Sequence, residues 1–151
     1  MKVYIATDHR GVDVEKQIVE SLKEKGMEII QTKIPHSDID DYPDFAFEVA
    51  NNVLKDKGSY GILICRTGIG MSIAANKVKG IRASVCKDVE TAKLTRIDNN
   101  SNILCLSYNT PLNELLDIID AYLNTSHSDE ERHHRRVDKI IKYENGEYNG
   151  L

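Results

Sequence analysis

One stretch of the chain combines a thiol with a glycine-containing loop. Cys65 ends an apolar run that begins at Tyr60, and glycines follow at positions 68 and 70 before a segment rich in Ala, Ile and Met. A buried strand, a glycine turn and a helix N-terminus, in that order, form a cradle of backbone N–H groups for an anion. These N–H groups also favour the thiolate form of a neighbouring cysteine. The stretch therefore predicts a reaction site with Cys65 as nucleophile or base.

The same residues also have a purely structural interpretation. A cysteine at the end of a strand commonly packs as a small hydrophobic side chain. A single Gly-x-Gly after a strand is a weak signal, because many α/β folds turn in this way for packing alone. The remaining polar residues of the chain must decide between the two interpretations.

Asp8 and His9 are a second candidate pair. They directly follow the apolar, β-branched segment 2–7, which we interpret as a strand. At the carboxyl end of a strand they could contact a ligand. Alternatively, they form an exposed loop in which Asp8 only caps the next helix.

A third candidate is a basic helix face. Arg132 and Arg136 are four residues apart, so they lie on one side of a predicted helix over about residues 129–143. Two guanidinium groups there suit a phosphate, whereas the alternative is a solvated face or salt bridges to neighbouring acids. His133 and His134 are adjacent and diverge by about 100° on a helix, which does not favour a shared metal ion. No metal site is predicted.

The composition limits the class of protein. The chain has 151 residues, a net charge of −4, 40% hydrophobic and 29% charged residues, as expected for one globular domain over residues 1–151. The charge disfavours nucleic acid, and the lack of an apolar run of membrane-spanning length disfavours a membrane partner. Residues 1–7 are too short and strand-like for a signal peptide. The three widely spaced cysteines favour neither a disulfide framework nor a zinc site, so we predict a cytoplasmic protein.

The hydrophobic pattern predicts the elements that position these residues. Short apolar runs alternate with segments of helical periodicity, which indicates an α/β fold with a five-stranded parallel sheet covered on both faces. The predicted strands are 2–7, 27–33, 60–64, 81–86 and 103–106. Asp88 is expected to cap a helix that ends near Arg96, and residues 98–101 form a polar turn and a further candidate site. The last helix should turn Val137, Ile140 and Ile141 inward, before a loose tail after residue 144.

The sequence resembles the ribose-5-phosphate isomerase B and galactose-6-phosphate isomerase family of sugar-phosphate isomerases over roughly residues 2–141. The most specific block is Cys65-x-Thr67-Gly68-Ile69-Gly70-Met71-Ser72-Ile73-Ala74-Ala75-Asn76-Lys77-Val78, followed by Gly80-Ile81-Arg82-Ala83. Supporting blocks are Asp8-His9-x-Gly11, Asp41-Tyr42-Pro43-Asp44, Asn99-x-x-Asn102 and Arg132-His133-x-x-Arg136-Val137.

The resemblance implies an aldose–ketose isomerase of phosphorylated sugars that works through an enediolate without metal or organic cofactor. The leading substrates are ribose 5-phosphate and ribulose 5-phosphate. The alternatives are a hexose 6-phosphate of the galactose or allose kind, or a non-catalytic sugar-phosphate-binding subunit. The implied fold is a Rossmann-like three-layer α/β/α sandwich. The implied assembly is a homodimer or dimer of dimers whose active sites lie at the subunit interface, with residues 98–99 reaching in from the neighbour.

The family's roles transfer residue by residue to this sequence. Cys65 matches the base that moves a proton between two sugar carbons. Thr67 and the amides of the following residues match the anion hole: Gly68, Ile69, Gly70, Met71 and Ser72. The implied phosphate contacts are His9, Arg132 and Arg136, and the implied hydroxyl contacts are Asp8 and Asn99.

Two positions depart from the family pattern. Asp98 stands where the family usually has a histidine, to which opening of the sugar ring is assigned. As the catalytic acid, Asp98 would need burial that favours its protonated form; otherwise ring opening rests on another group or on water. Arg66 stands where the family usually has glycine. A positive φ there would strain the arginine, whereas otherwise its charge is available beside the substrate.

Overall fold

Five parallel strands form the central sheet of the computed structural model, which describes residues 1–150. Their order across the sheet is β2-β1-β3-β5-β4. The strands are β1 (Lys2–Thr7), β2 (Glu28–Gln31), β3 (Tyr60–Cys65), β4 (Ala83–Val85) and β5 (Ile103–Ser107). The predicted α/β class and five-stranded parallel sheet are therefore confirmed, although β2 and β4 are shorter than the sequence pattern indicated.

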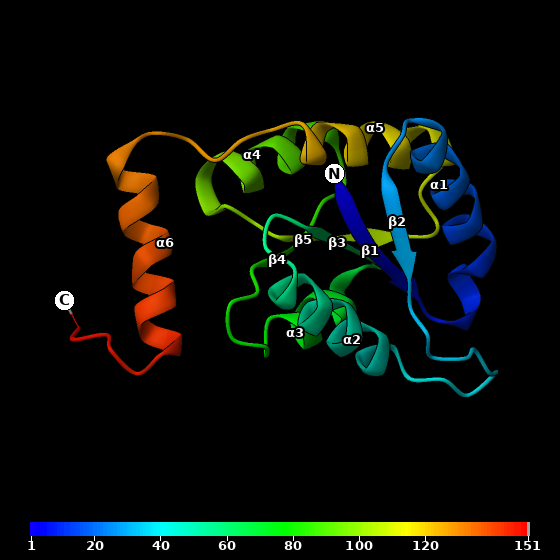
Figure 1. The fold of residues 1–151 in the computed structure, drawn as a ribbon, viewed down its shortest axis with the longest axis horizontal. Coiled ribbons are helices and arrows are strands. Elements are labelled where there is room, and N and C mark those ends of the chain that lie inside the picture. Colours follow the sequence, from blue (N-terminus) through cyan, green and yellow to red (C-terminus); the bar gives the residue numbers. More distant parts are fainter. Residues whose placement is uncertain (151) are drawn as a thin grey trace.

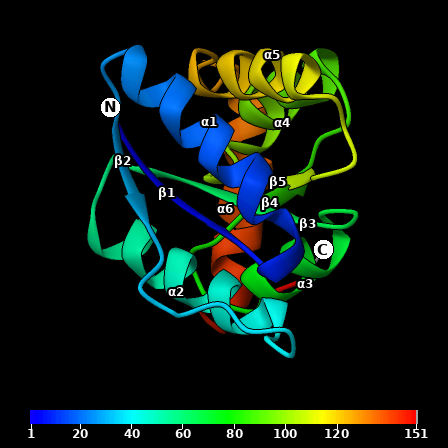
Figure 2. The same cartoon turned by 90° about the vertical axis from the view of Figure 1, so that its right-hand side faces the viewer.

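Helices cover both faces of this sheet, as Figure 1 shows. α1, α4 and α5 form one layer, α2 and α3 form the other, and α6 stands across one edge of the sandwich (Figures 1 and 2). The helices are α1 (Val12–Glu24), α2 (Tyr42–Lys55), α3 (Ile69–Ala75), α4 (Val89–Asn99), α5 (Leu112–Leu123) and α6 (Glu131–Glu144), and a short 3-10 helix spans His9–Gly11.

Two hydrophobic cores, one on each face of the sheet, hold the layers together. Because successive side chains of a strand point to opposite faces, Ile62 and Ile64 of β3 enter the core under α1 and α5. Leu63 and Cys65 enter the other core, with α2 and α3. The alternation of β3 thus directs the thiol towards the α2–α3 side.

Local signals explain where several helices begin. Asp88 caps α4: its carboxylate accepts from the Thr91 amide, and the Thr91 side chain accepts from the Asp88 amide. Pro43 lies in the first turn of α2, as expected. The Asp8 carboxylate accepts from the Arg10 amide at 3.0 Å and so caps the short 3-10 helix.

The C-terminal part of the chain differs from the sequence-based expectation in two places. α4 continues to Asn99, so Asp98 and Asn99 lie in its last turn and not in a polar turn. In α6 only His133 and Val137 are buried, and Ile140 is 47% exposed. The reason is that α6 crosses the sheet edge and packs mainly on α4, so its buried stripe is narrow. Residues 145–150 form no helix or strand, and Leu151 of the predicted loose tail lies outside the described residues.

The buried guanidinium of Arg96 joins four segments at the amino end of the sheet. It is 5% exposed and donates to the carbonyl oxygens of Ser101 at 2.5 Å and Thr125 at 3.0 Å. It also donates to the Tyr60 hydroxyl at 3.1 Å. Its carbon lies 4.9 Å and 5.7 Å from the ring centroids of Tyr60 and Tyr122. Arg96 therefore fixes the end of α4 relative to β3, β5 and the α5–α6 connection.

We expect Arg96→Lys to lower the free energy of unfolding by about 2–3 kcal/mol, because an ammonium group keeps the charge but does not reach the same acceptors. Urea unfolding followed by circular dichroism measures the change. Lys93→Ala, an exposed change on the same helix, should stay within about 0.5 kcal/mol of the parent. An Arg96→Lys variant as stable as the Lys93→Ala control would refute this role.

Candidate active site

Cys65 lies at the carboxyl end of β3 with its thiol held by the following loop. Cys65 is 6% exposed, and the Gly68 amide donates a hydrogen bond to its sulfur at 3.1 Å. The loop after β3 thus holds the Cys65 sulfur in place by a direct backbone hydrogen bond.

Close backbone packing explains the two glycines of this loop. Gly68 has φ +77°, and a Cβ there would lie 3.1 Å from the Leu106 amide nitrogen. A Cβ at Gly70 would lie 2.8 Å from the Tyr42 ring. The loop is therefore held between the backbone of β5 and the first residue of α2.

The amides predicted to form the anion hole are not equivalent. Gly68 donates to the thiol, Ile69 donates to the Thr67 hydroxyl at 3.2 Å, and Ser72 donates to the Gly68 carbonyl oxygen at 3.1 Å. The amides of Gly70 and Met71, in the first turn of α3, have no hydrogen-bond acceptor among residues 1–150. These two N–H groups are the ones available to an anion beside the thiol.

His9 is oriented by a carboxylate that the sequence analysis did not identify. Its Nδ1 lies 2.7 Å from Asp40 Oδ1, and its amide donates to the same oxygen at 3.2 Å. His36 Nδ1 approaches the other Asp40 oxygen at 3.0 Å. Burial alone would raise the pKa of Asp40, but hydrogen bonds from His9, His36 and the Ser37 amide lower it to about 2. Because the contact with Asp40 uses Nδ1, the Nε2 atom of His9 remains available to bind a ligand.

The predicted site residues fall into two groups at opposite ends of the sheet. One group, the carboxyl-edge group, comprises Asp8, His9, Cys65, Thr67 and residues 68–72, at the ends of the adjacent strands β1 and β3. The other, the amino-edge group, comprises Asp98, Asn99, Arg132 and Arg136, on α4 and α6.

The sheet itself separates the two groups. The Arg82 side chain, just before β4, donates to the Asn99 carbonyl oxygen at 3.1 Å, so the end of α4 lies where β4 and β5 begin. Cys65 pairs instead with Ser107, the last residue of β5. At about 3.3 Å per residue, the length of β5 places the groups roughly 15 Å apart. The structure of one chain does not bring the predicted site together.

Two side chains of the amino-edge group, Arg132 and Asp98, contact charged or titratable side chains of the same chain. Arg132 Nε lies 2.8 Å from a Glu130 carboxylate oxygen, whereas Arg136 has no ion-pair partner among residues 1–150. Asp98 Oδ1 lies 3.5 Å from His133 Nε2. On α6, Arg132 and Arg136 therefore form an exposed basic face, and the buried His133 lies beneath it.

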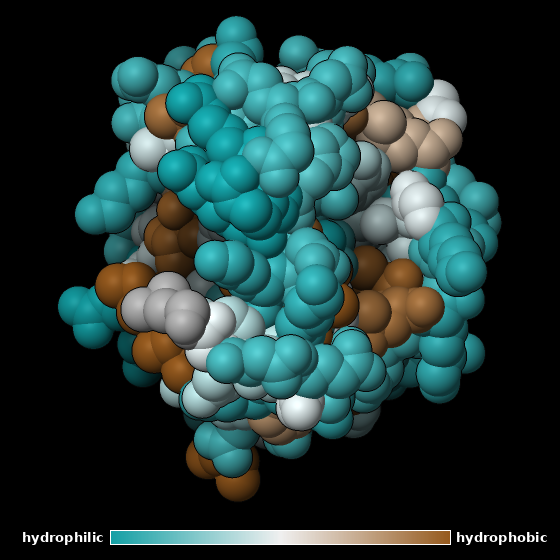
Figure 3. All heavy atoms as spheres, turned by 90° about the vertical axis from the view of Figure 1, so that its left-hand side faces the viewer, coloured by the Kyte–Doolittle hydropathy of each residue, from teal (hydrophilic) through white to brown (hydrophobic). Residues whose placement is uncertain are grey.

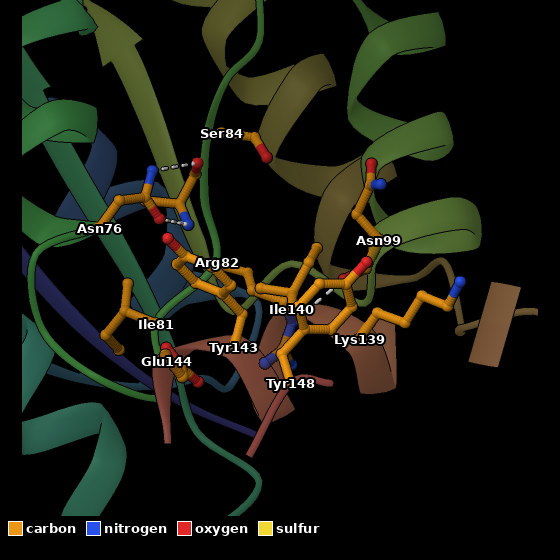
Figure 4. A pocket seen from close by; sticks show the side chains of 11 residues that line it. Asn76, Ile81, Arg82, Ser84, Asn99, Lys139, Ile140, Tyr143, Glu144 and Tyr148 are labelled. Carbon is orange, nitrogen blue, oxygen red and sulfur yellow. Dashed lines mark hydrogen bonds between the residues drawn. The ribbon is translucent and has the colours of Figure 1, made fainter. Parts of the chain in front are cut away.

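Asn99 borders a cavity of about 620 Å³ between α6 and the β4 edge of the sheet. Figure 4 shows it with Tyr143, Ile140 and Lys139 of α6. On the opposite wall, the Asn76 side-chain amide donates to the Ala83 carbonyl oxygen at 2.9 Å and accepts from the Ala83 amide at 2.8 Å. The cavity thus opens beside the free edge of β4.

Arg66 is not strained. Within residues 1–150, the only non-glycine residue with positive φ is Asn100, so the alternative of a left-handed Arg66 is wrong. The exposed Arg66 side chain and Thr67 line a cavity of about 460 Å³ next to the thiol loop, together with Lys87. Its positive charge is available at the carboxyl edge.

No three His, Cys, Asp or Glu side chains of residues 1–150 gather as metal ligands would. Within the same residues, none of the helices has the length and apolar character to cross a membrane. The predicted cytoplasmic location and the predicted absence of a cofactor stay predictions.

Comparison with known proteins assigns the class that this fold and thiol loop define. The profile of the family described as Ribose/Galactose Isomerase matches residues 3–140. The chain belongs to this family of isomerases.

Several similar proteins within the family are named ribose-5-phosphate isomerase B. Ribose-5-phosphate isomerase B of Mycobacterium leprae is 38% identical over 146 residues, which cover 95% of this chain and 90% of the relative. The crystal structure of ribose-5-phosphate isomerase B from Mycoplasma genitalium with bound ribulose 5-phosphate is similar, with TM-score 0.87, 43% identity and coverage of 95% of this chain and 96% of the other. The structure of the type B ribose 5-phosphate isomerase of Trypanosoma cruzi is also similar to this one. Its TM-score is 0.89 and its sequence is 39% identical, over 97% of this chain and 99% of the other.

The Asp40 contacts predict how stability depends on pH. Because the pKa of Asp40 falls from 3.8 to about 2 on folding, its carboxylate stabilises the protein above pH 3.8 and the stabilisation disappears as the pH falls through 2. The difference in unfolding free energy between the parent and Asp40→Asn should therefore shrink between pH 5 and pH 2. Urea unfolding at each pH measures it, with Asp38→Asn in the same exposed connection as the control. A difference that stays constant over this range would contradict the assignment.

Proposed function

We propose that this protein interconverts ribose 5-phosphate and ribulose 5-phosphate. The observation that carries the proposal is the thiol of Cys65 beside the unpaired amides of Gly70 and Met71. The family membership and the relative that binds ribulose 5-phosphate support it. An assay of the purified protein against pentose and hexose phosphates tests it, and turnover of neither pentose phosphate would reject it.

The proposed chemistry moves one proton between neighbouring carbons. The Cys65 thiolate takes the proton from C2 of the open-chain aldose, and the electron pair of that C–H bond forms a C1–C2 double bond while the C1 oxygen becomes negative. The C2 hydroxyl proton passes to the C1 oxygen, and the electron pair left on O2 forms the C2 carbonyl while the C1–C2 double-bond electrons take the proton back from the thiol at C1, which yields the ketose and regenerates the thiolate. A positioned base of this kind contributes about 10²–10⁴ in rate. Each amide of Gly70 and Met71 aimed at the enediolate oxygen contributes roughly 3–4 kcal/mol.

A second copy of the chain completes this site. Because the two groups of residues lie at opposite ends of the sheet, the amino-edge group of one protomer serves the carboxyl-edge group of its partner. A twofold axis makes two such sites at once, in a homodimer or in a dimer of dimers. Arg132 and Arg136 of the partner then join His9 around the phosphate, and Asn99 of the partner contacts a sugar hydroxyl.

Exposed apolar side chains support this assembly. On the α2–α3 side they include Phe47, Ile69 and Ile73, and on α6 they are Ile140 and Tyr143. Figure 3 views the face that carries α6, where hydrophobic atoms lie exposed on both sides of a hydrophilic strip. Apolar patches of this kind on a soluble fold are typical of subunit contacts.

One observation favours a second substrate class. The Arg66 side chain and the cavity of about 460 Å³ beside the thiol loop leave room and positive charge for a longer sugar. A hexose 6-phosphate of the galactose or allose kind is therefore the alternative substrate. A non-catalytic sugar-phosphate-binding subunit is less consistent with the structure, because binding alone does not require a thiol with a hydrogen bond from the loop.

We expect Cys65→Ala to reduce turnover by at least about 10²-fold while substrate binding and the fold persist, because the base is lost. Cys65→Ser should be nearly as inactive, since a hydroxyl is a far weaker base. Steady-state kinetics and calorimetric titration with ribulose 5-phosphate measure the two effects. Cys86→Ala, which also removes a buried thiol, should retain activity. Full activity in either Cys65 variant would remove this residue from the mechanism.

Mixed dimers test whether two chains share each site. Arg136→Ala should weaken phosphate binding by about 1.5–3 kcal/mol, so Cys65→Ala and Arg136→Ala chains are both poorly active alone at low substrate concentration. Unfolding and refolding them together in equal amounts should restore about a quarter of the parent activity, because half of the dimers contain one intact site.

The control for this experiment mixes Cys65→Ala with the double variant Cys65→Ala/Arg136→Ala, which contains no intact site in any combination. Recovery in the control, or none in the first mixture, would contradict a site shared between subunits.

A further inference from the structure

One buried carboxylate, that of Asp40, contacts two histidine rings at the carboxyl edge of the sheet. The Asp40 side chain is 7% exposed, and its Oδ1 atom lies 2.7 Å from His9 Nδ1 and 3.2 Å from the His9 amide nitrogen. Its Oδ2 atom lies 3.0 Å from His36 Nδ1 and 3.4 Å from the Ser37 amide nitrogen. Each oxygen of this carboxylate therefore faces one ring nitrogen and one backbone N–H group.

The hydrophobic core holds the far side of this cluster in place. The His36 ring stacks on Phe45 of α2, with the ring centroids 5.0 Å apart and the planes at 22°. Phe45 itself is fully buried. A continuous line of contacts thus runs from the core through His36 and Asp40 to His9, so the carboxylate has a fixed position although it lies in the connection between β2 and α2.

The charge of Asp40 determines which nitrogen of His9 carries a proton. Burial alone would raise the pKa of Asp40, but the hydrogen bonds from His9, His36 and the Ser37 amide lower it to about 2. At neutral pH the carboxylate therefore only accepts hydrogen bonds, and His9 Nδ1 must donate to it. A neutral imidazole has a single ring proton, so a neutral His9 presents a lone pair at Nε2.

That lone pair does not suit the phosphate group of the proposed substrate. A phosphate ester has its second pKa near 6 and is mostly a dianion at neutral pH, which only accepts hydrogen bonds. Contact with His9 Nε2 then needs one more proton, placed either on Nε2 or on the phosphate oxygen that faces it. In both cases the complex contains one proton more than the neutral His9 and the free dianion, and this proton comes from the solvent.

We propose that Asp40 is a positioning residue that couples binding of the substrate phosphate to uptake of one proton at His9, an inference that rests on the proposed isomerase function. Asp40 does not touch the substrate. Its negative charge lies on one side of the ring and the phosphate lies on the other, so the two anions stabilise the imidazolium between them. The coupling favours a phosphorylated sugar over an unphosphorylated one, because only the phosphate supplies the second anion.

The other titratable groups near His9 come from neighbouring segments. Within residues 1–150, Asp40 is the only ion-pair partner of His9. Asp8 and Arg10 flank it in sequence, and the Asp8 carboxylate accepts from the Arg10 amide at 3.0 Å. Cys65 ends the adjacent strand β3.

On the other side of the cluster, Glu15 of α1 is close enough to His36 for their charges to interact. Burial raises the pKa of Glu15. Arg132 and Arg136 of the partner subunit stay charged throughout, so they bind the phosphate without taking up a proton. Proton uptake on binding therefore reports on His9, provided that the Cys65 thiol is removed.

Calorimetric titration measures the proton uptake directly. The probe is ribulose 5-phosphate, and the protein is the Cys65→Ala chain, which should bind without turnover. Titrations in two buffers with different enthalpies of ionisation give the number of protons taken up per site. At pH 7.5 we expect more than about half a proton with Asp40 present, and less than about a fifth after Asp40→Asn or His9→Gln is added. Asp38→Asn, an exposed change in the same connection, is the matched control and should leave the uptake unchanged.

The affinity at two pH values separates the charge of Asp40 from a merely structural role. Asp40→Asn in the Cys65→Ala chain should weaken binding of ribulose 5-phosphate about 5- to 30-fold at pH 8, because the imidazolium loses its carboxylate. At pH 6 an imidazole is largely charged without this help, so the deficit should narrow to less than about threefold. A structural defect would instead persist, since Asp40 keeps its charge over this range.

The outcomes distinguish this coupling from the isomerase function. Full proton uptake in Asp40→Asn, or an equal deficit in affinity at both pH values, would overturn the coupling. If Asp40→Asn does not fold, His9→Gln decides, because full uptake in that variant would place the proton elsewhere. Normal turnover of the parent without proton uptake in the Cys65→Ala chain would reject the coupling alone. A parent that turns over neither pentose phosphate would reject the proposed function and the coupling with it.

Discussion

The parallel direction of all five strands is the constraint on which the arrangement of this molecule depends. Every strand ends at the same edge of the sheet. The direction of the strands is therefore sufficient to place Asp8, His9 and Cys65 at that edge. Each connecting helix must then return to the opposite edge, which is where α4 delivers Asp98 and Asn99. The division of the site residues between two edges is thus a consequence of topology and not of local sequence.

Each edge is held by a different kind of contact. At the carboxyl edge, missing side chains matter: the absence of a Cβ at Gly68 and Gly70 lets the loop approach β5 and Tyr42 closely enough to aim its amides. At the amino edge, the guanidinium of Arg96 binds carbonyl oxygens and stacks on aromatic rings without a carboxylate partner. Its charge is stabilised by peptide dipoles and aromatic faces, which keeps it buried.

The sequence allowed much of the fold and the reactive loop to be predicted, because those signals are local. Strand β3, the cap at Asp88 and the glycine loop each follow from residues close together in the chain. Asp40 was missed because its partner His9 lies 31 residues away and only the β2–α2 connection brings them together. The exposure of Ile140 was missed for a similar reason: helical periodicity does not reveal that α6 packs mainly on α4, over a narrow stripe.

The pairing of Asn76 with β4 determines how the sheet ends. β4 is the last strand, and the outward N–H and C=O of Ala83 are already matched by the two polar atoms of the Asn76 amide. The Asn76 side chain makes the two hydrogen bonds that a sixth strand would make at this position. The backbone N–H and C=O of Ala83 are then not available to a strand of another molecule. Contacts with another molecule at Ala83 must therefore come from side chains and not from backbone pairing. The amide of one asparagine in this way shields part of one edge of the sheet from strand addition.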